Sequence, residues 1–148
     1  MIMTQEDKEL LFKDLCARLP YHVKASYYGV EEERETWDVI EGITLDGYVD
    51  IGQYSLPIEG IKPYLYPLSS ITEEMLEELN ANGFFKYRDT IVNVSHIESK
   101  NGISKEIYTY IDIESISFLT EYFHSHHIDY RGLIEKGLAI NATGLNIY

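Results

Sequence analysis

The sequence predicts an α+β fold in which an antiparallel meander and a hairpin pack with about three helices. Three observations support this class. Apolar residues alternate over several short segments, and Asp-Gly and Asn-Gly pairs stand where hairpin turns are expected. Three other segments space their apolar residues three or four apart, as amphipathic helices do. The chain has 148 residues, of which 45% are hydrophobic, and this suits a single domain over residues 1–148.

The first expected element is a helix that begins after Thr4 and is stopped by Pro20. Thr4 has a capping side chain, and acidic residues follow it in the first turn, where they favour the positive end of the helix dipole. The apolar stripe of this helix comprises Leu11, Phe12, Leu15, Cys16 and Leu19. Because Cys16 lies within that stripe, we expect a packed and inert thiol.

Three strands are expected next, over residues 22–28, 36–44 and 48–51. Residues 31–35 are mostly glutamate and predict an exposed acidic loop between the first two strands. Asp46-Gly47 is a typical hairpin turn between the second and the third. The three strands should form the meander.

Residues 52–70 contain the remaining prolines and predict an ordered crossover laid over the core. Between Pro63 and Pro67 the backbone is biased to extended forms. Alternation then turns Leu65 into the core, and it turns Tyr64 and Tyr66 outward together. Two aromatic rings side by side on a stiff segment would suit an interface.

Two further helices are expected. Ser70 with Glu73 forms a capping box for the first of them, with Thr72 as the alternative cap, and Asn82-Gly83 ends it. The second runs over about residues 115–127, and His126 falls on its apolar stripe. A short helical turn over 131–137 and a last strand over 138–140 should follow.

Between these helices, residues 90–113 predict a hairpin around Asn101-Gly102. A two-residue turn there pairs positions whose numbers sum to 203. The expected partners are Val92 with Ile111, Val94 with Thr109, His96 with Ile107, and Glu98 with Lys105. Tyr108 and Tyr110 would then lie together on the opposite face of this hairpin.

Residues 124–131 hold the main concentration of residues of the types found in functional sites. His124 and His127 are three apart and could hold a metal ion, but the i, i+4 pair of the HExxH metal site is missing. Histidines in the last turn of a helix also favour its negative end, which is a structural role. Asp112 and Glu114 could act as paired carboxylates, although solvated charges at a strand end are the commoner arrangement. We therefore expect no catalytic residue and no cofactor, and His124 and His127 are the only metal candidates.

Charge limits the choice of partners. Twelve Lys and Arg against 25 Asp and Glu give a net charge of -13, and no basic run is present, so nucleic acid is not expected as a partner. Tyrosine occurs 13 times, and this residue is enriched at the cores of interfaces. The interface candidates are Tyr64, Tyr66, Tyr108 and Tyr110.

The single cysteine and the absence of a signal-like leader or a long apolar run predict a cytoplasmic protein that does not enter the membrane.

Three segments resemble a known family, namely residues 14–21, residues 61–74 and residues 126–140, which begins His-His-Ile-Asp-Tyr-Arg-Gly-Leu-Ile. The family consists of uncharacterised small proteins from gut anaerobes, often encoded near prophages or other mobile elements. The resemblance implies an accessory protein of such an element, and it carries no site residue, cofactor or activity.

The expected function is non-enzymatic: binding of a protein partner, or self-association, through tyrosines with an acidic rim. One alternative is a small metal-dependent or acid/base enzyme built on the C-terminal histidines. Another is an acidic mimic of nucleic acid that inhibits a defence enzyme.

Overall fold

The structure is a computed structural model that describes residues 3–87, 90–93, 96–100, 103–108 and 113–148. It divides into two compact units. Unit 1 runs to Leu68 and resumes at Phe123, and unit 2, Ser69–Tyr122, is inserted between these two parts. Helices and a mixed sheet occur together, so the predicted α+β class is confirmed. The single domain over 1–148 stays a prediction.

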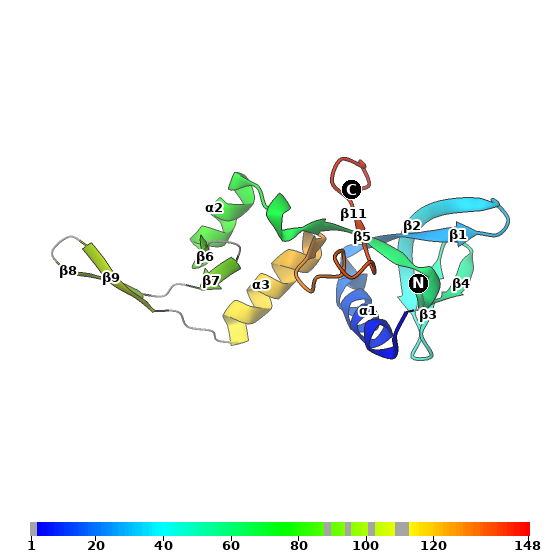
Figure 1. Ribbon diagram of the computed structural model, residues 1–148, viewed down its shortest axis with the longest axis horizontal. Helices are drawn as coiled ribbons and strands as arrows, with labels where there is room; N and C mark the ends of the chain where they lie inside the picture. The colour runs from blue at the N-terminus through cyan, green and yellow to red at the C-terminus, as the bar shows by residue number, and fades with distance from the viewer. Residues whose placement is uncertain (1–2, 88–89, 94–95, 101–102, 109–112) are drawn as a thin grey trace. The chain divides into compact units, whose positions relative to one another are not determined.

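Unit 1 contains one long helix and most of the strands (Figure 1). Its elements up to residue 68 are α1 (Gln5–Arg18), η1 (Leu19–Tyr21), β1 (Lys24–Gly29), β2 (Arg34–Ile43), β3 (Tyr48–Ile51), β4 (Tyr54–Pro57), η2 (Ile58–Gly60) and β5 (Lys62–Pro67). Its C-terminal part adds the end of α3 (Ile113–Ser125), then β10 (Ile128–Asp129) and β11 (Ile140–Asn141).

The sheet of unit 1 has the strand order β10-β5-β1-β2-β3-β4, and β11 also pairs with β5. The strands β1 to β4 are joined in sequence as antiparallel neighbours, which confirms the meander and extends it by one strand. A register shift between Ile40 and Gly42 marks a β-bulge in β2. Both β10 and β11 run parallel to β5, so the C-terminal segment closes onto a strand more than 60 residues earlier in the chain.

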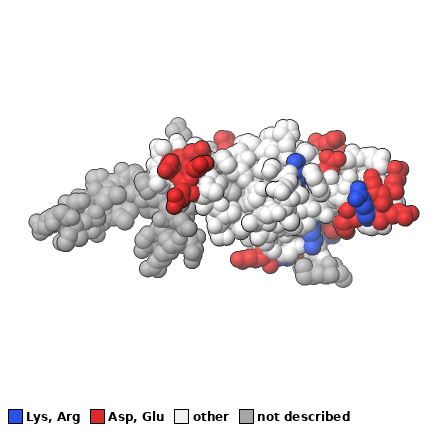
Figure 2. Space-filling model, turned by 90° about the horizontal axis from the view of Figure 1, so that it is seen from above, with Lys and Arg blue, Asp and Glu red and all other residues white. Residues whose placement is uncertain are grey.

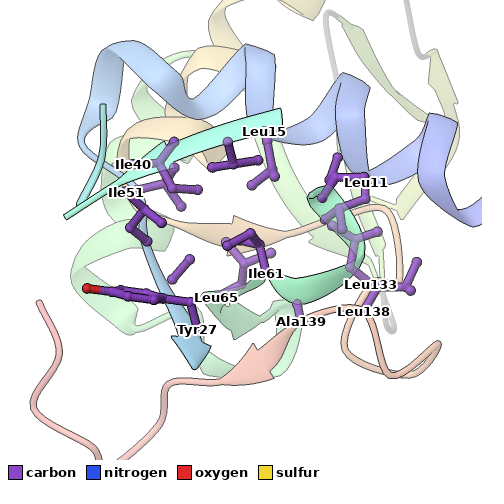
Figure 3. Packing of buried hydrophobic residues seen from close by; sticks show 14 residues of the cluster. Leu11, Leu15, Tyr27, Ile40, Ile51, Ile61, Leu65, Leu133, Leu138 and Ala139 are labelled. Atoms are coloured by element: carbon purple, nitrogen blue, oxygen red, sulfur yellow. The ribbon is translucent and has the colours of Figure 1, made fainter. Parts of the chain in front are cut away.

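Helix α1 packs on one face of this sheet and forms the core with it (Figure 3). Thr4 caps the helix as predicted. Its side chain accepts from the Asp7 N–H, and the Asp7 carboxylate accepts from the Thr4 N–H. The buried face of α1, however, comprises Leu11, Asp14, Leu15 and Arg18. Cys16 is exposed, so the prediction of a packed thiol was wrong. The helix is rotated from the expected stripe because Asp14 and Arg18 form an ion pair and are buried together.

The proline-rich segment is part of the sheet and not a cover over the core. Strand β5 pairs antiparallel with β1, through Pro63 opposite Ala25 and Lys62 opposite Ser26. Leu65 is fully buried, which confirms it as a core residue. Sequence reasoning placed this segment outside the sheet because proline removes a hydrogen-bond donor.

The third helix ends earlier than predicted, at Ser125, because His127 adopts the left-handed conformation with φ 58°. This break turns the chain, and His126 is exposed, so its place on a buried stripe was wrong. The last strand was expected over 138–140 and lies at Ile140–Asn141.

Unit 2 contains η3 (Leu68–Ser70, which begins in unit 1), α2 (Glu73–Ala81), β6 (Phe84–Tyr87), β7 (Thr90–Asn93), β8 (His96–Lys100), β9 (Ile103–Tyr108) and most of α3. Thr72 caps α2 by accepting from the Met75 N–H, so the alternative cap is the one observed. In the same unit, the Tyr122 hydroxyl donates to Glu78 at 2.9 Å.

The second hairpin differs from the prediction in two ways. Strand β7 pairs with β6, which places Val92 opposite Phe85, and Ile111, the partner expected for Val92, lies outside the described residues. Strands β8 and β9 pair as expected next to the turn, but a register shift at Glu98/Ser99 then places Glu98 opposite Glu106 and His96 opposite Tyr108. The expected Glu98–Lys105 and His96–Ile107 pairs were therefore wrong. Val94, Thr109 and Tyr110 lie outside the described residues.

Candidate protein-interaction surface

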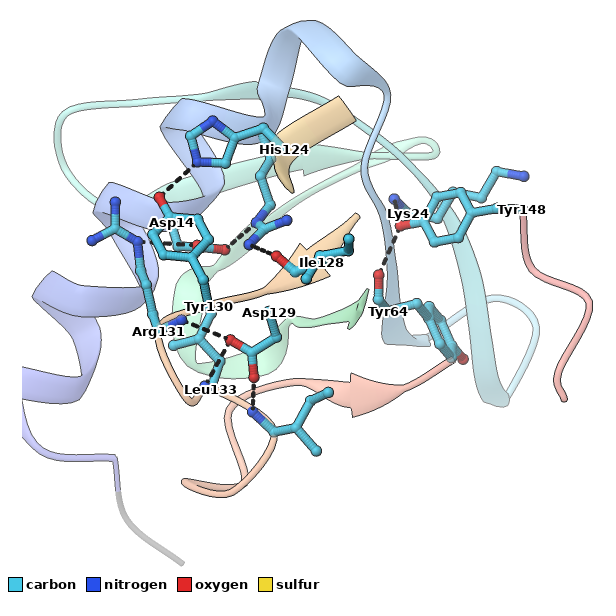
Figure 4. A network of polar contacts seen from close by, with 12 residues as sticks. Asp14, Lys24, Tyr64, His124, Ile128, Asp129, Tyr130, Arg131, Leu133 and Tyr148 are labelled. Atoms are coloured by element: carbon cyan, nitrogen blue, oxygen red, sulfur yellow. Dashed lines mark hydrogen bonds and ion pairs between the residues drawn. The ribbon is translucent and has the colours of Figure 1, made fainter. Parts of the chain in front are cut away.

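A buried ion pair on α1 determines how the C-terminal segment of unit 1 is held (Figure 4). Arg18 Nε donates to Asp14 Oδ2 at 2.7 Å, and Arg18 Nη2 donates to the Ile128 carbonyl at 2.6 Å. Arg131 Nε lies 3.2 Å from the second oxygen of Asp14. Buried charges are tolerated when each has a partner of opposite charge or a hydrogen bond. This network therefore attaches β10 to α1.

Asp129 holds the turn that follows β10. Its carboxylate accepts from the backbone N–H groups of Arg131, Leu133 and Ile134, at 3.2, 3.0 and 2.9 Å. Three backbone donors thus satisfy the hydrogen-bonding capacity of this buried side chain. The predicted turn over 131–137 is thus fixed by the acidic residue that precedes it.

The histidines proposed as metal ligands contact different partners. His124 is buried, and its Nε2 lies 2.8 Å from the Tyr130 hydroxyl. The ring of His127 stacks on Tyr148, with 3.6 Å between ring centroids. In the part of the chain that the structure describes, no three His, Cys, Asp or Glu side chains are grouped as metal ligands would be.

Burial disfavours the charged form of both histidine rings. Burial lowers the pKa of His124, and the nearby Arg18 charge lowers it further. Burial lowers the pKa of His127 from 6.5 to about 4, with Arg18 contributing next. Both rings pack against tyrosines of the C-terminal segment, His124 against Tyr130 and His127 against Tyr148.

Tyr148 completes the sheet at the point where β1 and β5 separate. Its hydroxyl accepts from the Lys24 N–H at 3.0 Å and donates to the Tyr64 carbonyl at 2.8 Å (Figure 4). Lys24 and Tyr64 would be the next pair in the register that joins Ala25 with Pro63. The phenol therefore replaces a direct backbone hydrogen bond, and burial raises the pKa of Tyr148 to about 12.

The predicted pair Tyr64 and Tyr66 lies opposite Leu65, as alternation requires, but both side chains are only half-exposed. The ring of Tyr66 packs against Tyr148, with 6.0 Å between centroids. The two tyrosines thus share the side opposite Leu65, as predicted, but each ring is partly covered, and their role at an interface stays a prediction. Of the other two candidates, Tyr108 ends β9 and its side chain is not described, and Tyr110 lies outside the described residues.

The face of the sheet away from α1 carries exposed aromatic rings instead. Ser26 pairs with Trp37 and Tyr28 pairs with Glu35, and cross-strand partners point to the same side. Tyr28 is 51% exposed and Trp37 is 45% exposed, whereas Tyr27 is turned into the core.

Lys24 lies between two of these rings. Its Nζ is 5.0 Å from the ring centroid of Trp37 and 5.5 Å from that of Tyr148, which is 39% exposed. The same Nζ donates to the Ile147 carbonyl at 2.7 Å. We call Tyr28, Trp37 and Tyr148, with Lys24 between the last two, the aromatic face. Sequence reasoning did not single out Trp37 or Tyr148. The sequence signal that points to this face is the alternation along β1, where Ser26 and Tyr28 alternate with the buried Ala25 and Tyr27.

The predicted acidic loop joins β1 to β2, is exposed, and is held by hydrogen bonds to Gln53 and Tyr54. The Tyr54 hydroxyl donates to Glu32 at 2.8 Å and accepts from the Glu31 N–H at 3.0 Å. Gln53 donates to the Glu31 carboxylate at 2.8 Å. Figure 2 shows more Asp and Glu than Lys and Arg on the face in view, in keeping with the net charge of -13.

The fold and this surface define an α+β chain with an exposed aromatic sheet face next to an acidic turn. Comparison with protein-family models, curated proteins and solved structures gave no match. Among the described residues, no helix is long and apolar enough to span a membrane.

Proposed function

We propose that the chain is a non-enzymatic interaction protein that binds a basic segment of a partner protein on the aromatic face. The observation that carries this proposal is the position of Tyr28 and Trp37, both about half exposed on one side of the β1–β2 pair, with Glu35 directly opposite Tyr28. Aromatic residues on a rigid strand lose little conformational entropy when a partner binds.

The chemistry of the face favours a cationic partner. The Lys24 ammonium lies 5.0 Å from the Trp37 ring centroid, which shows the kind of contact that Lys or Arg of a partner would make with the exposed surface of Trp37 and Tyr28. Glutamates in the adjacent turn, residues 31–33, are exposed and would attract such a segment from solution. The net charge of -13 acts in the same direction.

The proposal also includes the origin and the cellular location of the protein. The resemblance given above supports an accessory protein encoded with a mobile element. The chain's single cysteine supports a cytoplasmic location.

Calorimetric titration with two peptides of equal length tests the proposal. One peptide is rich in Arg and Lys, and the other is rich in Asp and Glu. The basic peptide should bind, in a salt-sensitive manner, and the acidic peptide should not. The double variant Tyr28→Ala with Trp37→Ala should weaken binding about tenfold or more, because each lost cation–π contact contributes about 1 kcal/mol.

Tyr48→Ala is the matched control, since Tyr48 is also 45% exposed but lies on β3, outside the aromatic face. Equal binding of the two peptides, or a double variant that binds as tightly as the Tyr48→Ala control, would show that this face is not the binding surface.

A further inference from the structure

A groove of about 630 Å³ lies in unit 1 between α1, the β2–β3 turn and η2. Its apolar lining includes Phe12, Tyr48, Pro57 and Ile58. Lys8 and Glu59 form an ion pair at 2.5 Å that joins α1 to η2. The pair therefore bridges the two sides of the groove.

One face of α1 lines this groove. The lining positions are 5, 8, 9, 12 and 13, which follow the i, i+3, i+4, i+7, i+8 spacing of a single helix face. The core uses a different set on the same helix, from Leu11 to Arg18. Phe12 is therefore half-buried, at the border between the core and the groove.

A protruding apolar side chain stands at the edge of the same groove. Leu45 lies in the β2–β3 turn, which Gly47 closes with φ 84°, and it is 95% exposed. Tyr48, the first residue after the turn, is 45% exposed. The surface thus places an apolar projection directly beside an apolar hollow.

The charges at the groove include both signs. Lys8 and Lys13 stand against Glu9, Asp46 and Glu59, which makes the lining nearly neutral on a chain with a net charge of -13. Within the described residues, neither Lys13 nor Asp46 forms an ion pair. A partner with a strong charge of one sign would meet as much repulsion as attraction there.

We propose that this groove is the interface of a symmetric dimer, in which Leu45 of each copy enters the groove of the other. A twofold interface requires a self-complementary surface, and an adjacent projection and hollow with unpaired charges of both signs provide one. Two acidic chains also repel least where their surfaces are nearly neutral. Lys13 of one copy would then pair with Asp46 of the other.

Sedimentation equilibrium of the full chain over a range of concentrations tests the proposal. The wild-type chain should dimerise reversibly. Leu45→Asp should weaken dimerisation at least about tenfold, because it removes a buried Leu and adds a charge at the interface. Circular dichroism should show an unchanged fold, since Leu45 is 95% exposed.

A charge exchange identifies the contact more closely. Lys13→Asp and Asp46→Lys should each weaken the dimer, and the combination should restore it. Val30→Asp is the matched control, because Val30 is 65% exposed but lies outside the groove, and it should leave the dimer intact.

A wild-type chain that is monomeric at every concentration would overturn the proposal, and so would a dimer insensitive to Leu45→Asp or equally disrupted by Val30→Asp. The result is separate from the proposed function, since Leu45→Asp should still bind the basic peptide.

Discussion

Arg18 Nε donates to Asp14 Oδ2 at 2.7 Å, and neither side chain has any exposed surface. The two residues are one helical turn apart on α1, on the face that also carries Leu11 and Leu15. A guanidinium in this position costs free energy to desolvate, and only its partners offset that cost. The pair makes the stability of unit 1 sensitive to either charge.

Arg18→Met should destabilise the fold by about 3–5 kcal/mol, because it leaves Asp14 buried without its main partner and removes the hydrogen bond to Ile128. Urea unfolding measures the loss. Arg34→Met, the same substitution at an exposed position of β2, is the control and should change stability by less than about 0.5 kcal/mol. The double variant Asp14→Leu with Arg18→Met should recover much of the loss. If Arg18→Met is as stable as the control, the pair does not fix the fold.

Stability should depend on the charge of His127. Its pKa is 6.5 in the unfolded chain and about 4 in the folded protein. Between these values the unfolded chain takes up a proton that the folded protein does not, so stability falls as the pH drops from about 6.5 to 4. The slope from this one group is at most about 1.4 kcal/mol per pH unit.

Urea unfolding at several pH values, compared between the wild-type chain and His127→Phe, isolates this effect. The phenyl ring can keep the stack on Tyr148 but cannot take up a proton. The stability of the wild-type chain should therefore fall more steeply than that of the variant as the pH drops from about 6.5 to 4. Parallel curves would mean that His127 titrates normally in the folded protein.

The Tyr148 hydroxyl should contribute to stability through the two backbone groups it joins. Tyr148→Phe leaves the Lys24 N–H and the Tyr64 carbonyl without this partner, at a cost of about 1–3 kcal/mol. Tyr48→Phe is the control, because the Tyr48 ring is 45% exposed on another strand and should tolerate the change. Thermal unfolding compares the two, and similar melting temperatures would show that the bridge contributes nothing.

Leu65→Ala should cost about 2–5 kcal/mol, since Leu65 is fully buried in the middle of β5. Leu145→Ala removes the same atoms from a side chain that is 49% exposed and should cost much less. Tyr66→Ala should also lower stability, because the ring packs against Tyr148. Chemical denaturation of the three variants would contradict this packing if Leu65→Ala and Leu145→Ala unfold alike.

Local patterns in the sequence determined much of the fold. The cap at Thr4, the meander with its Asp46-Gly47 turn and the buried Leu65 all follow from spacing, turn chemistry and alternation. Each of these depends on residues that are close in the chain, and for this reason the sequence alone predicts them. The predicted acidic loop belongs to the same group.

Other features were decided by contacts between distant segments. Asp14 and Arg18 appear polar in the sequence, and they are buried only because Ile128 and Arg131 supply their partners. The same applies to β5, whose place in the sheet depends on its pairing with the distant strands β1, β10 and β11. The same reason explains why Asp14 is buried, why Cys16 is exposed and where the aromatic face lies. Each depends on which other segments of the chain pack against that position. Only the tertiary structure determines those partners, because they lie far apart in the sequence.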